Sequence, residues 1–456
     1  MKKELWLAVA LLAYAAARVA PPVTGLNEAS QAALAVTIAG TILWITEAVP
    51  LGVTALLVVV LLAINPGMHL PDALHGFTSE VTFFLVGVAA IGTAVEASGL
   101  AQRAARFLAR SARGNPTRLY VQMILALPAL AFLVPSAITR NAILIPAYRE
   151  ALETMGVGKS GRVGRALMLA LGMLNPLASS ALLTGGIASI AAATLLGGFS
   201  WLGWFALMAV PYYALIFLGG IWLRMMVGPF ENGGPCTAKP VVEPLSTAEI
   251  KTLAILAATA LLWLTDAWHH LSPAIPALMA AIVLLAPRVG ALTWKQFESK
   301  LSWGLILTVG ASMSLARAMI DTGAASWLGA AFVDRLTSAA VAPAAIVVLL
   351  VVAVALVHLA ITNLAACMAL LIPIAVTIAQ AAHLNPLVCG LIVTIAVDAI
   401  ILYPVQTAAN LLAYEAGYFP SADVRRLGFG MLVLTIAVAL LVLPYWSLLG
   451  LPLVPT

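Results

Sequence analysis

Long apolar blocks follow one another along almost the whole 456-residue chain, separated by short polar breaks. A helix needs about 20 apolar residues to cross the roughly 30 Å of hydrocarbon in a bilayer. Hydrophobic residues make up 63% of the chain and charged residues only 9%, against roughly 25% in a soluble domain. The blocks do not alternate apolar and polar residues as the strands of a membrane β-barrel do. The sequence therefore predicts an all-α polytopic protein of the cytoplasmic (inner) membrane.

Composition and motifs argue against several other classes. A net charge of +5 suits basic loops that orient membrane helices, so no nucleic-acid partner is expected. Cys236, Cys367 and Cys389 form no CxxC pair, and the six histidines show no ligand spacing, so we predict no metal cluster and no cofactor. The chain has no HExxH-like run and no P-loop, so it is expected to be neither an enzyme nor ATP-driven.

The first apolar block follows Met1-Lys2-Lys3 and has two interpretations. It resembles a signal peptide, which is removed, and it also resembles an uncleaved first helix. We favour an N-terminal helix within residues 1–29, because a polytopic protein can use its first span as its own signal.

The chain also contains an internal repeat. The matches are WITEA (44–48) with WLTDA (263–267), Gly87 with Gly310, and AIT (137–139) with AIT (360–362). Their offset stays near one value, and an internal repeat in a polytopic protein is typical of a transporter. We assign one repeat to residues 30–226 and the other to 249–450, with a cytoplasmic linker at 227–248.

Polar breaks interrupt the apolar blocks at matching places in the two halves. They fall at 135–141, 183–186, 359–363 and 403–410. Such interruptions indicate the binding site of a secondary transporter. If 117–155 and 342–382 are re-entrant hairpins, eleven spans remain, with the N-terminus inside and the C-terminus outside. Nearly all Lys and Arg then fall inside, as the positive-inside rule requires, and the two repeats are inverted.

One segment after the fourth span is basic and amphipathic. Arg103, Arg106, Arg110 and Arg113 share one helical face. The pattern predicts an interfacial helix along the cytoplasmic surface. At the equivalent place in the second repeat, 324–336 predicts a shorter interfacial helix on the outside.

Four longer motifs connect the chain to a known family. They are WITEAVPLGVTALL (44–57), FLVGVAAIGTAVEASGLAQR (84–103), TWKQFESKLSWGLILTVGASMSLARAMIDTG (293–323) and PVQTAANLLAYEAGYF (404–419). At these motifs the chain resembles the divalent anion:sodium symporter family, whose members move di- and tricarboxylates or sulfate. The resemblance implies inverted repeats, each with a re-entrant hairpin and a broken helix. It also implies a homodimer and an elevator mechanism, in which a transport domain slides past a fixed scaffold.

The hairpin tips depart from the family pattern, which is a Ser-Asn-Thr motif that touches substrate and helps to ligate sodium. Ser136 matches the serine of the first tip, but Ala137 and Ile138 replace the other two residues. Thr362 and Asn363 fit the second tip better. By this resemblance the first sodium site is depleted. The sodium ligands that the resemblance implies are Ser136, Gly185, Thr362, Asn363 and Gln406.

Donors at the tips and breaks are the expected anion ligands, because bare charge near the membrane midplane costs several kcal/mol. Helix N-termini at the tips add partial positive charge and free N–H groups. The expected substrate-binding residues are Ser136, Thr139, Arg140, Asn141, Thr362, Asn363, Thr407 and Asn410.

Two charged residues within apolar segments stand out. The planar guanidinium of Arg140 suits bidentate contact with a carboxylate. We expect it to replace part of the charge that sodium supplies at the first site in other family members. The alternative is that Arg140 extends to the cytoplasmic interface. Asp398 is a candidate cation ligand or proton carrier, with a hydrogen-bonded structural role as the alternative.

The sequence thus predicts secondary active transport of a small divalent or trivalent anion, coupled to sodium or achieved by anion exchange. A cation/proton antiporter or arsenite-type efflux protein of related architecture is the alternative. Residue types alone leave the anion open, because carboxylate and sulfate require the same donors.

Overall fold

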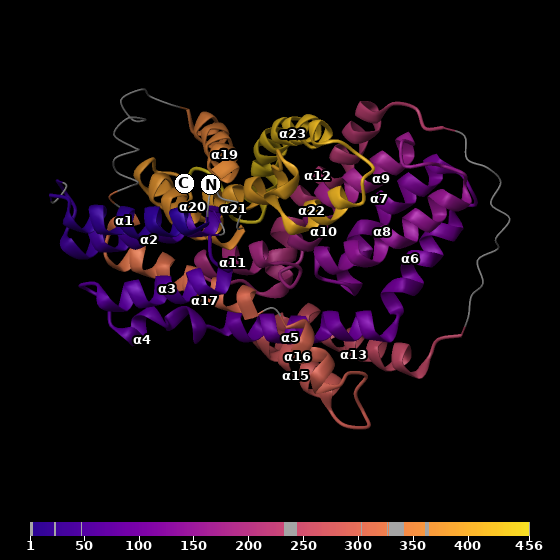
Figure 1. Ribbon diagram of the computed structural model, residues 1–456, viewed down its shortest axis with the longest axis horizontal. Coiled ribbons are helices and arrows are strands. Elements are labelled where there is room, and N and C mark those ends of the chain that lie inside the picture. The colour runs from indigo at the N-terminus through magenta and orange to yellow at the C-terminus, as the bar shows by residue number, and fades with distance from the viewer. Residues whose placement is uncertain are drawn as a thin grey trace.

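The computed structural model describes residues 3–21, 24–46, 48–231, 244–301, 303–325, 327, 342–360 and 364–455. All regular secondary structure in these ranges is helical, which confirms the predicted all-α class. The arrangement of the helices is shown in Figure 1.

The first half of the chain begins with helices that lead up to the first hairpin. They are α1 (Lys3–Val19), α2 (Glu28–Thr46), α3 (Leu51–Ile64), α4 (Leu70–Ala73), η1 (His75–Phe77), α5 (Glu80–Ser98) and α6 (Leu100–Ser111). The hairpin and the segments after it follow. These are α7 (Pro116–Leu133), α8 (Ala137–Thr154), α9 (Arg162–Met173), α10 (Asn175–Ser180), α11 (Ile187–Leu195) and α12 (Trp201–Val227).

The second half has its own series of helices. Its leading helices are α13 (Thr247–Leu264), α14 (Asp266–His269), α15 (Ala274–Leu285), α16 (Trp294–Lys300) and α17 (Trp303–Asp321). The rest are α19 (Pro343–Ala360), α20 (Leu364–Ala381), α21 (Pro386–Ala399), η2 (Pro404–Gln406), α22 (Ala408–Glu415) and α23 (Ser421–Leu448). Most of the predicted linker (232–243) and most of the predicted second interfacial helix lie outside the described residues.

Helices from both halves pack into a central bundle, which we define as α7–α12 with α19–α23. Within it α9 packs on α22, α12 on α23, and α20 on α21. The remaining helices, α1–α5 and α13–α17, form a peripheral set. In Figure 1, α1 to α4 and α17 lie at one side, and α5, α13, α15 and α16 lie along the lower edge. Helix α6 connects α5 to the central bundle, at the place predicted for the first interfacial helix.

The two halves interlock in the peripheral set. Helix α5 packs on α15 of the other half, and α17 packs on α3 and η1. The repeated glycines lie at these crossings. A Cβ atom on Gly87 would fall 2.6–2.8 Å from Ala277, and one on Gly310 would fall 2.6–2.9 Å from the ring of Phe77. Both positions therefore require glycine for the same reason, which is close approach of another element.

The two helix pairs of the predicted hairpins match in length and in detail. Helices α7, α8, α19 and α20 each have 18 residues, and Pro146 and Pro373 stand at the same place in α8 and α20. Ala137 begins α8, whereas Ala360 ends α19, so these two matched alanines occupy different places in their helix pairs. Ile361 and Thr362 lie outside the described residues.

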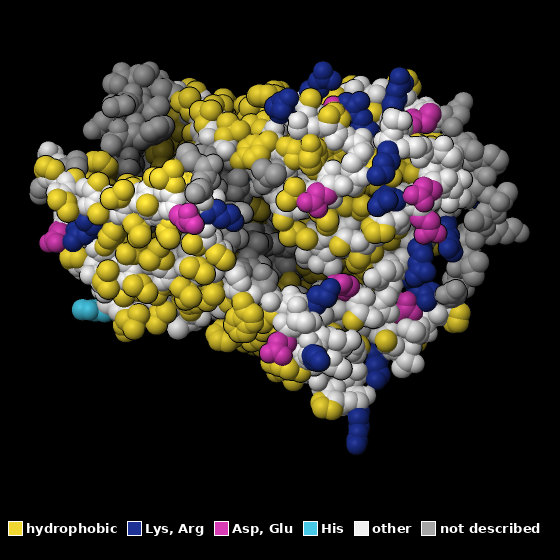
Figure 2. Space-filling model, in the orientation of Figure 1, with side chains coloured by type: hydrophobic (Ala, Val, Ile, Leu, Met, Phe, Trp, Pro, Cys, Tyr) yellow, Lys and Arg dark blue, Asp and Glu magenta, His cyan; other side chains and the backbone are white. Residues whose placement is uncertain are grey.

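Among the described residues, length and apolarity mark five helical segments as able to cross a membrane by themselves: His75–Ser98, α7, α12, α13 and α23. Helices such as α3, α15 and α21 are apolar but shorter. The eleven spans and their inverted orientation therefore stay predictions. Figure 2 shows Lys and Arg gathered on the half of this face over α6–α9, while hydrophobic side chains dominate the half over α1–α3.

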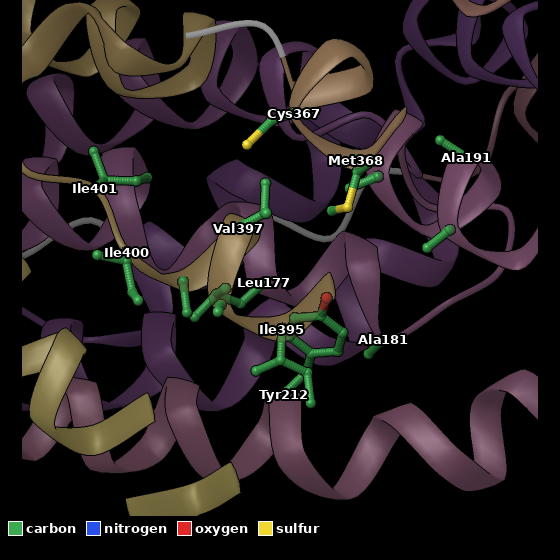
Figure 3. Packing of buried hydrophobic residues seen from close by; sticks show 14 of the residues in the cluster. Leu177, Ala181, Ala191, Tyr212, Cys367, Met368, Ile395, Val397, Ile400 and Ile401 are labelled. Atoms are coloured by element: carbon green, nitrogen blue, oxygen red, sulfur yellow. The ribbon is translucent and has the colours of Figure 1, made fainter. Parts of the chain in front are cut away.

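The core of the central bundle is built by both halves together. Figure 3 shows Leu177 of α10 and Tyr212 of α12 close to Ile395 of α21, with Cys367 and Met368 of α20 nearby. Apart from Tyr212, whose hydroxyl is hydrogen-bonded, these side chains are apolar, and all five are fully buried.

The close packing of α5 on α15 can be tested with two glycines of α5, one at the contact and one away from it. Gly87→Ala is expected to destabilise the protein by about 1–3 kcal/mol, because the added methyl overpacks the contact with Ala277. Gly92, on the same helix, has no heavy atom within 4 Å of an added Cβ. Gly92→Ala should therefore be neutral or stabilising by about 0.5–1 kcal/mol. Denaturation midpoints in detergent measure both changes, and equal midpoints would contradict the packing argument.

Candidate functional site

The first hairpin tip is created by a proline and a capping serine. Pro135 disfavours the helical region for the residue before it, and Val134 is extended, with φ −128° and ψ 92°. Helix α7 ends there. Ser136 then caps α8, since its Oγ accepts a hydrogen bond from the backbone N–H of Thr139 at 3.3 Å.

Arg140 lies in the first turn of α8 and is only 1% exposed. Its five N–H groups all donate to neutral oxygens. Nε donates to Asn175 Oδ1 at 2.7 Å, and one terminal nitrogen donates to the carbonyls of Val134 and Pro135 at 2.6 and 2.9 Å. The other terminal nitrogen donates to the Asn175 carbonyl and to Ser179 Oγ, at 2.7 and 2.8 Å. Arg140 is thus enclosed in protein, and it does not extend to an interface.

No acidic side chain in the described part of the chain pairs with Arg140. None of the ion pairs among the described residues includes it. A buried cation needs hydrogen bonds or an anion to offset desolvation. Here neutral dipoles solvate the guanidinium, and its positive charge remains uncompensated beside the tip.

An asparagine pair extends this network to the other half of the chain. Asn175 Nδ2 donates to Asn141 Oδ1 at 2.7 Å. Asn141 Nδ2 in turn donates to the carbonyls of Leu171 and Ala409, both at 2.9 Å. Ala409 lies in the first turn of α22, so the N-terminal turns of α8 and α22 are held directly together.

The second break follows the same logic as the first tip. Pro404 leaves Tyr403 extended, with φ −148° and ψ 157°. Thr407 caps α22 by accepting from the backbone N–H of Asn410 at 3.3 Å. Gln406 spans the break, because its side chain donates to the carbonyls of His358 and Ile400 at 3.2 and 3.1 Å. The break is therefore tied to the last turn of α19.

The predicted site residues fall into two groups. Ser136, Thr139 and Thr407 are half-buried at the starts of helices, where their hydroxyls remain within reach of a ligand. The buried ones are Arg140, Asn141, Gln406 and Asn410. Thr362 and Asn363 lie outside the described residues. Gly185 permits a close backbone approach, since a Cβ there would lie 1.8 Å from the Ser179 carbonyl oxygen.

Asp398 lies in the last turn of α21 and is 5% exposed. The hydroxyl of Tyr212 donates to its Oδ2 at 2.6 Å. Because Tyr212 belongs to α12, this bond links the two halves of the chain, as the bond from Asn141 does. Its geometry suits the structural alternative and does not test the cation-ligand or proton-carrier role.

Sequence reasoning missed three residues of this network: Asn175, Ser179 and Tyr212. Asn175 and Ser179 lie within a block that we treated as uniformly apolar. A signal was present, because an Asn-Pro pair followed by two serines interrupts that block. Tyr212 gave no such signal, since tyrosine is common within apolar helices.

The assembled site has a distinct chemistry. Two helix N-termini meet, half-buried hydroxyls line them, and an uncompensated cation lies behind them. Helix N-termini and hydroxyl donors both favour an anion. The fold defines a multi-pass membrane protein in which the N-terminus of the hairpin helix α8 meets the N-terminus of α22, the helix that follows the second break.

Comparison with known proteins gives the family. A family model described as sodium:sulfate symporter transmembrane region matches residues 2–452, and the chain belongs to this family. It is therefore a transporter, and the predicted resemblance is confirmed. Among curated relatives, a "membrane protein" of Cupriavidus necator is 25% identical over 94% of this chain and 90% of its own length.

Two further relatives carry more specific names. The L-tartrate/succinate antiporter of Escherichia coli is 26% identical, over 80% of this chain and 78% of its own length. Mouse solute carrier family 13 member 2 is 29% identical, over 34% of this chain and 26% of its own length. The Alcanivorax borkumensis YdaH transporter has a similar fold, with a TM-score of 0.57 and 16% identity over 84% of this chain and 88% of that one.

The five hydrogen bonds of Arg140 predict that stability requires the shape of the guanidinium group and not its charge alone. Arg140→Lys is expected to destabilise the protein by about 3 kcal/mol, because lysine has three donors and leaves buried acceptors unpaired. Arg106→Lys is the control, since Arg106 is exposed on α6 and should change stability by less than about 0.5 kcal/mol. Chemical unfolding in micelles compares the two, and a lysine variant as stable as the wild type would refute the argument.

Proposed function

We propose that this protein is a secondary active transporter that exchanges small dicarboxylates, or related di- and trivalent anions including sulfate, across the cytoplasmic membrane. The observation that carries the proposal is the meeting of the α8 and α22 N-termini beside Arg140. An anion placed there would gain hydroxyl donors from Ser136, Thr139 and Thr407. Thr362 and Asn363 are proposed to complete the site from the second tip.

The proposed movement is an elevator, in which the central bundle slides past the peripheral helices. Bonds such as Asn141 to Ala409 and Tyr212 to Asp398 support it, because they hold both halves of the central bundle together. The two inverted repeats, the eleven spans and a homodimer belong to the same proposal. So do an N-terminus in the cytoplasm and a C-terminus outside.

Exchange is favoured over sodium symport by the fixed charge of Arg140. A sodium ion can leave after it has accompanied an anion, but a buried guanidinium cannot. An empty carrier would then hold an uncompensated cation, which disfavours its return through the membrane. The name of the Escherichia coli antiporter agrees with this mode. Family membership favours both modes over a cation/proton or arsenite-type transporter.

Reconstitution in liposomes tests the coupling. Uptake of labelled succinate is expected to require succinate inside the vesicle and to be unchanged when choline replaces sodium outside. The same vesicles are then loaded with tartrate, citrate or sulfate to define the anions accepted. Uptake into empty vesicles that depends on a sodium gradient would overturn exchange and establish symport.

A single hydroxyl tests the location of the site. Thr139→Val is expected to raise KM for the transported anion about tenfold or more, because a hydrogen bond to a charged group contributes about 1.5–3 kcal/mol. Valine has nearly the same shape, and the Ser136 cap uses only the backbone N–H of Thr139. Thr154→Val, at the other end of α8, is the matched control and should leave KM unchanged. Equal KM values for both variants would place the anion elsewhere.

A further inference from the structure

A cavity of about 260 Å³ lies between the central bundle and the peripheral helices. Glu80 and Phe84, one turn apart on α5, line one wall. Ala193 of α11 and the loop residue Phe199 line the opposite side, and Pro273, just before α15, closes it. The cavity also reaches Leu183 in the first break. Elements of both the central bundle and the peripheral set therefore line it.

The lining is mostly apolar, with a single carboxylate. Thr194 and Ser272 also line the cavity, but their hydroxyl oxygens are engaged. Thr194 donates to the Ile190 carbonyl at 3.0 Å, and Ser272 accepts from the backbone N–H of Ala274 at 3.3 Å. Glu80 is exposed and takes no part in the ion pairs of the described residues.

We propose that this cavity binds a small organic ammonium ion with an apolar body. The ammonium group would lie beside the Glu80 carboxylate, and the apolar body would pack against the rings of Phe84 and Phe199. Aromatic faces and a carboxylate are the groups that recognise such cations. The transported anion is excluded from this cavity by the negative charge of Glu80.

Occupation of the cavity inhibits transport without competing with the anion. The occupant contacts α11 of the central bundle and α5 of the peripheral set together, so it resists their sliding. This step rests on the proposed elevator movement, whereas the binding step does not. The ammonium group could come from a free amine or from a phosphatidylethanolamine headgroup, since both present the same chemistry.

Calorimetric titration of the purified protein with 2-phenylethylammonium tests the binding step. Phenylacetate, which has a similar body and the opposite charge, is the control ligand and should not bind. Glu80→Gln is expected to weaken binding about tenfold or more. Glu96→Gln, at the other end of α5, should leave binding unchanged. Ala193→Phe fills the cavity and should abolish binding, with gel filtration confirming that the variant is folded.

Uptake into liposomes tests the inhibition step. 2-Phenylethylammonium is expected to lower the maximal rate of anion uptake without changing KM, and Glu80→Gln should remove this effect. Competition in phosphatidylglycerol vesicles with and without phosphatidylethanolamine identifies the natural source of the ammonium group. Equal binding of phenylacetate, no binding of the amine, or binding without inhibition would overturn the proposal. If the protein transports no anion, the titration still decides the binding step separately.

Discussion

The need to solvate one buried cation organises the centre of this protein. Arg140 lies where water is excluded, and each of its five N–H groups has a protein acceptor. Three of these acceptors are backbone carbonyls, two of them freed where α7 ends at the tip. The end of α7 and the burial of Arg140 are therefore mutually stabilising. The break supplies unpaired carbonyls, and the guanidinium satisfies them.

The hydrogen-bond network around Arg140 extends well beyond α8. Asn175 accepts from Arg140 and donates to Asn141, and Asn141 then binds the first turn of α22. These hydrogen bonds thus connect the first tip to the second break, which belongs to the other half of the sequence. Glycines at the α5–α15 and α17–η1 crossings interlock the two halves a second time. Neither half could keep its site if folded alone.

Features that depend on residues close together in the sequence could be predicted from the sequence. The apolar blocks gave the all-α class, and the polar breaks at 135–141 and 403–410 marked where α8 and α22 begin. What could not be predicted depends on contacts between distant segments. Arg140 donates hydrogen bonds to the side chains of Asn175 and Ser179, which lie more than thirty residues away along the chain. Ala137 and Ala360 of the Ala-Ile-Thr match fall at opposite kinds of helix end, because identity of three residues does not fix where a helix begins.

The network also gives a reason why an anion at the proposed site would be attracted by Arg140 without direct contact. Its hydrogen bonds are all occupied, so a ligand at the tip would feel its charge through space. At about 8 Å and an effective dielectric near 20, that attraction is about 2 kcal/mol for each unit of charge. A dianion gains twice as much as a monoanion, whereas hydroxyl donors distinguish them less. In the proposed exchange mode, departure of the anion would leave the same charge facing an empty site, which would disfavour sliding until another anion binds. One fixed cation, held by neutral dipoles, is thus the physical basis that we propose for both charge selectivity and obligatory exchange.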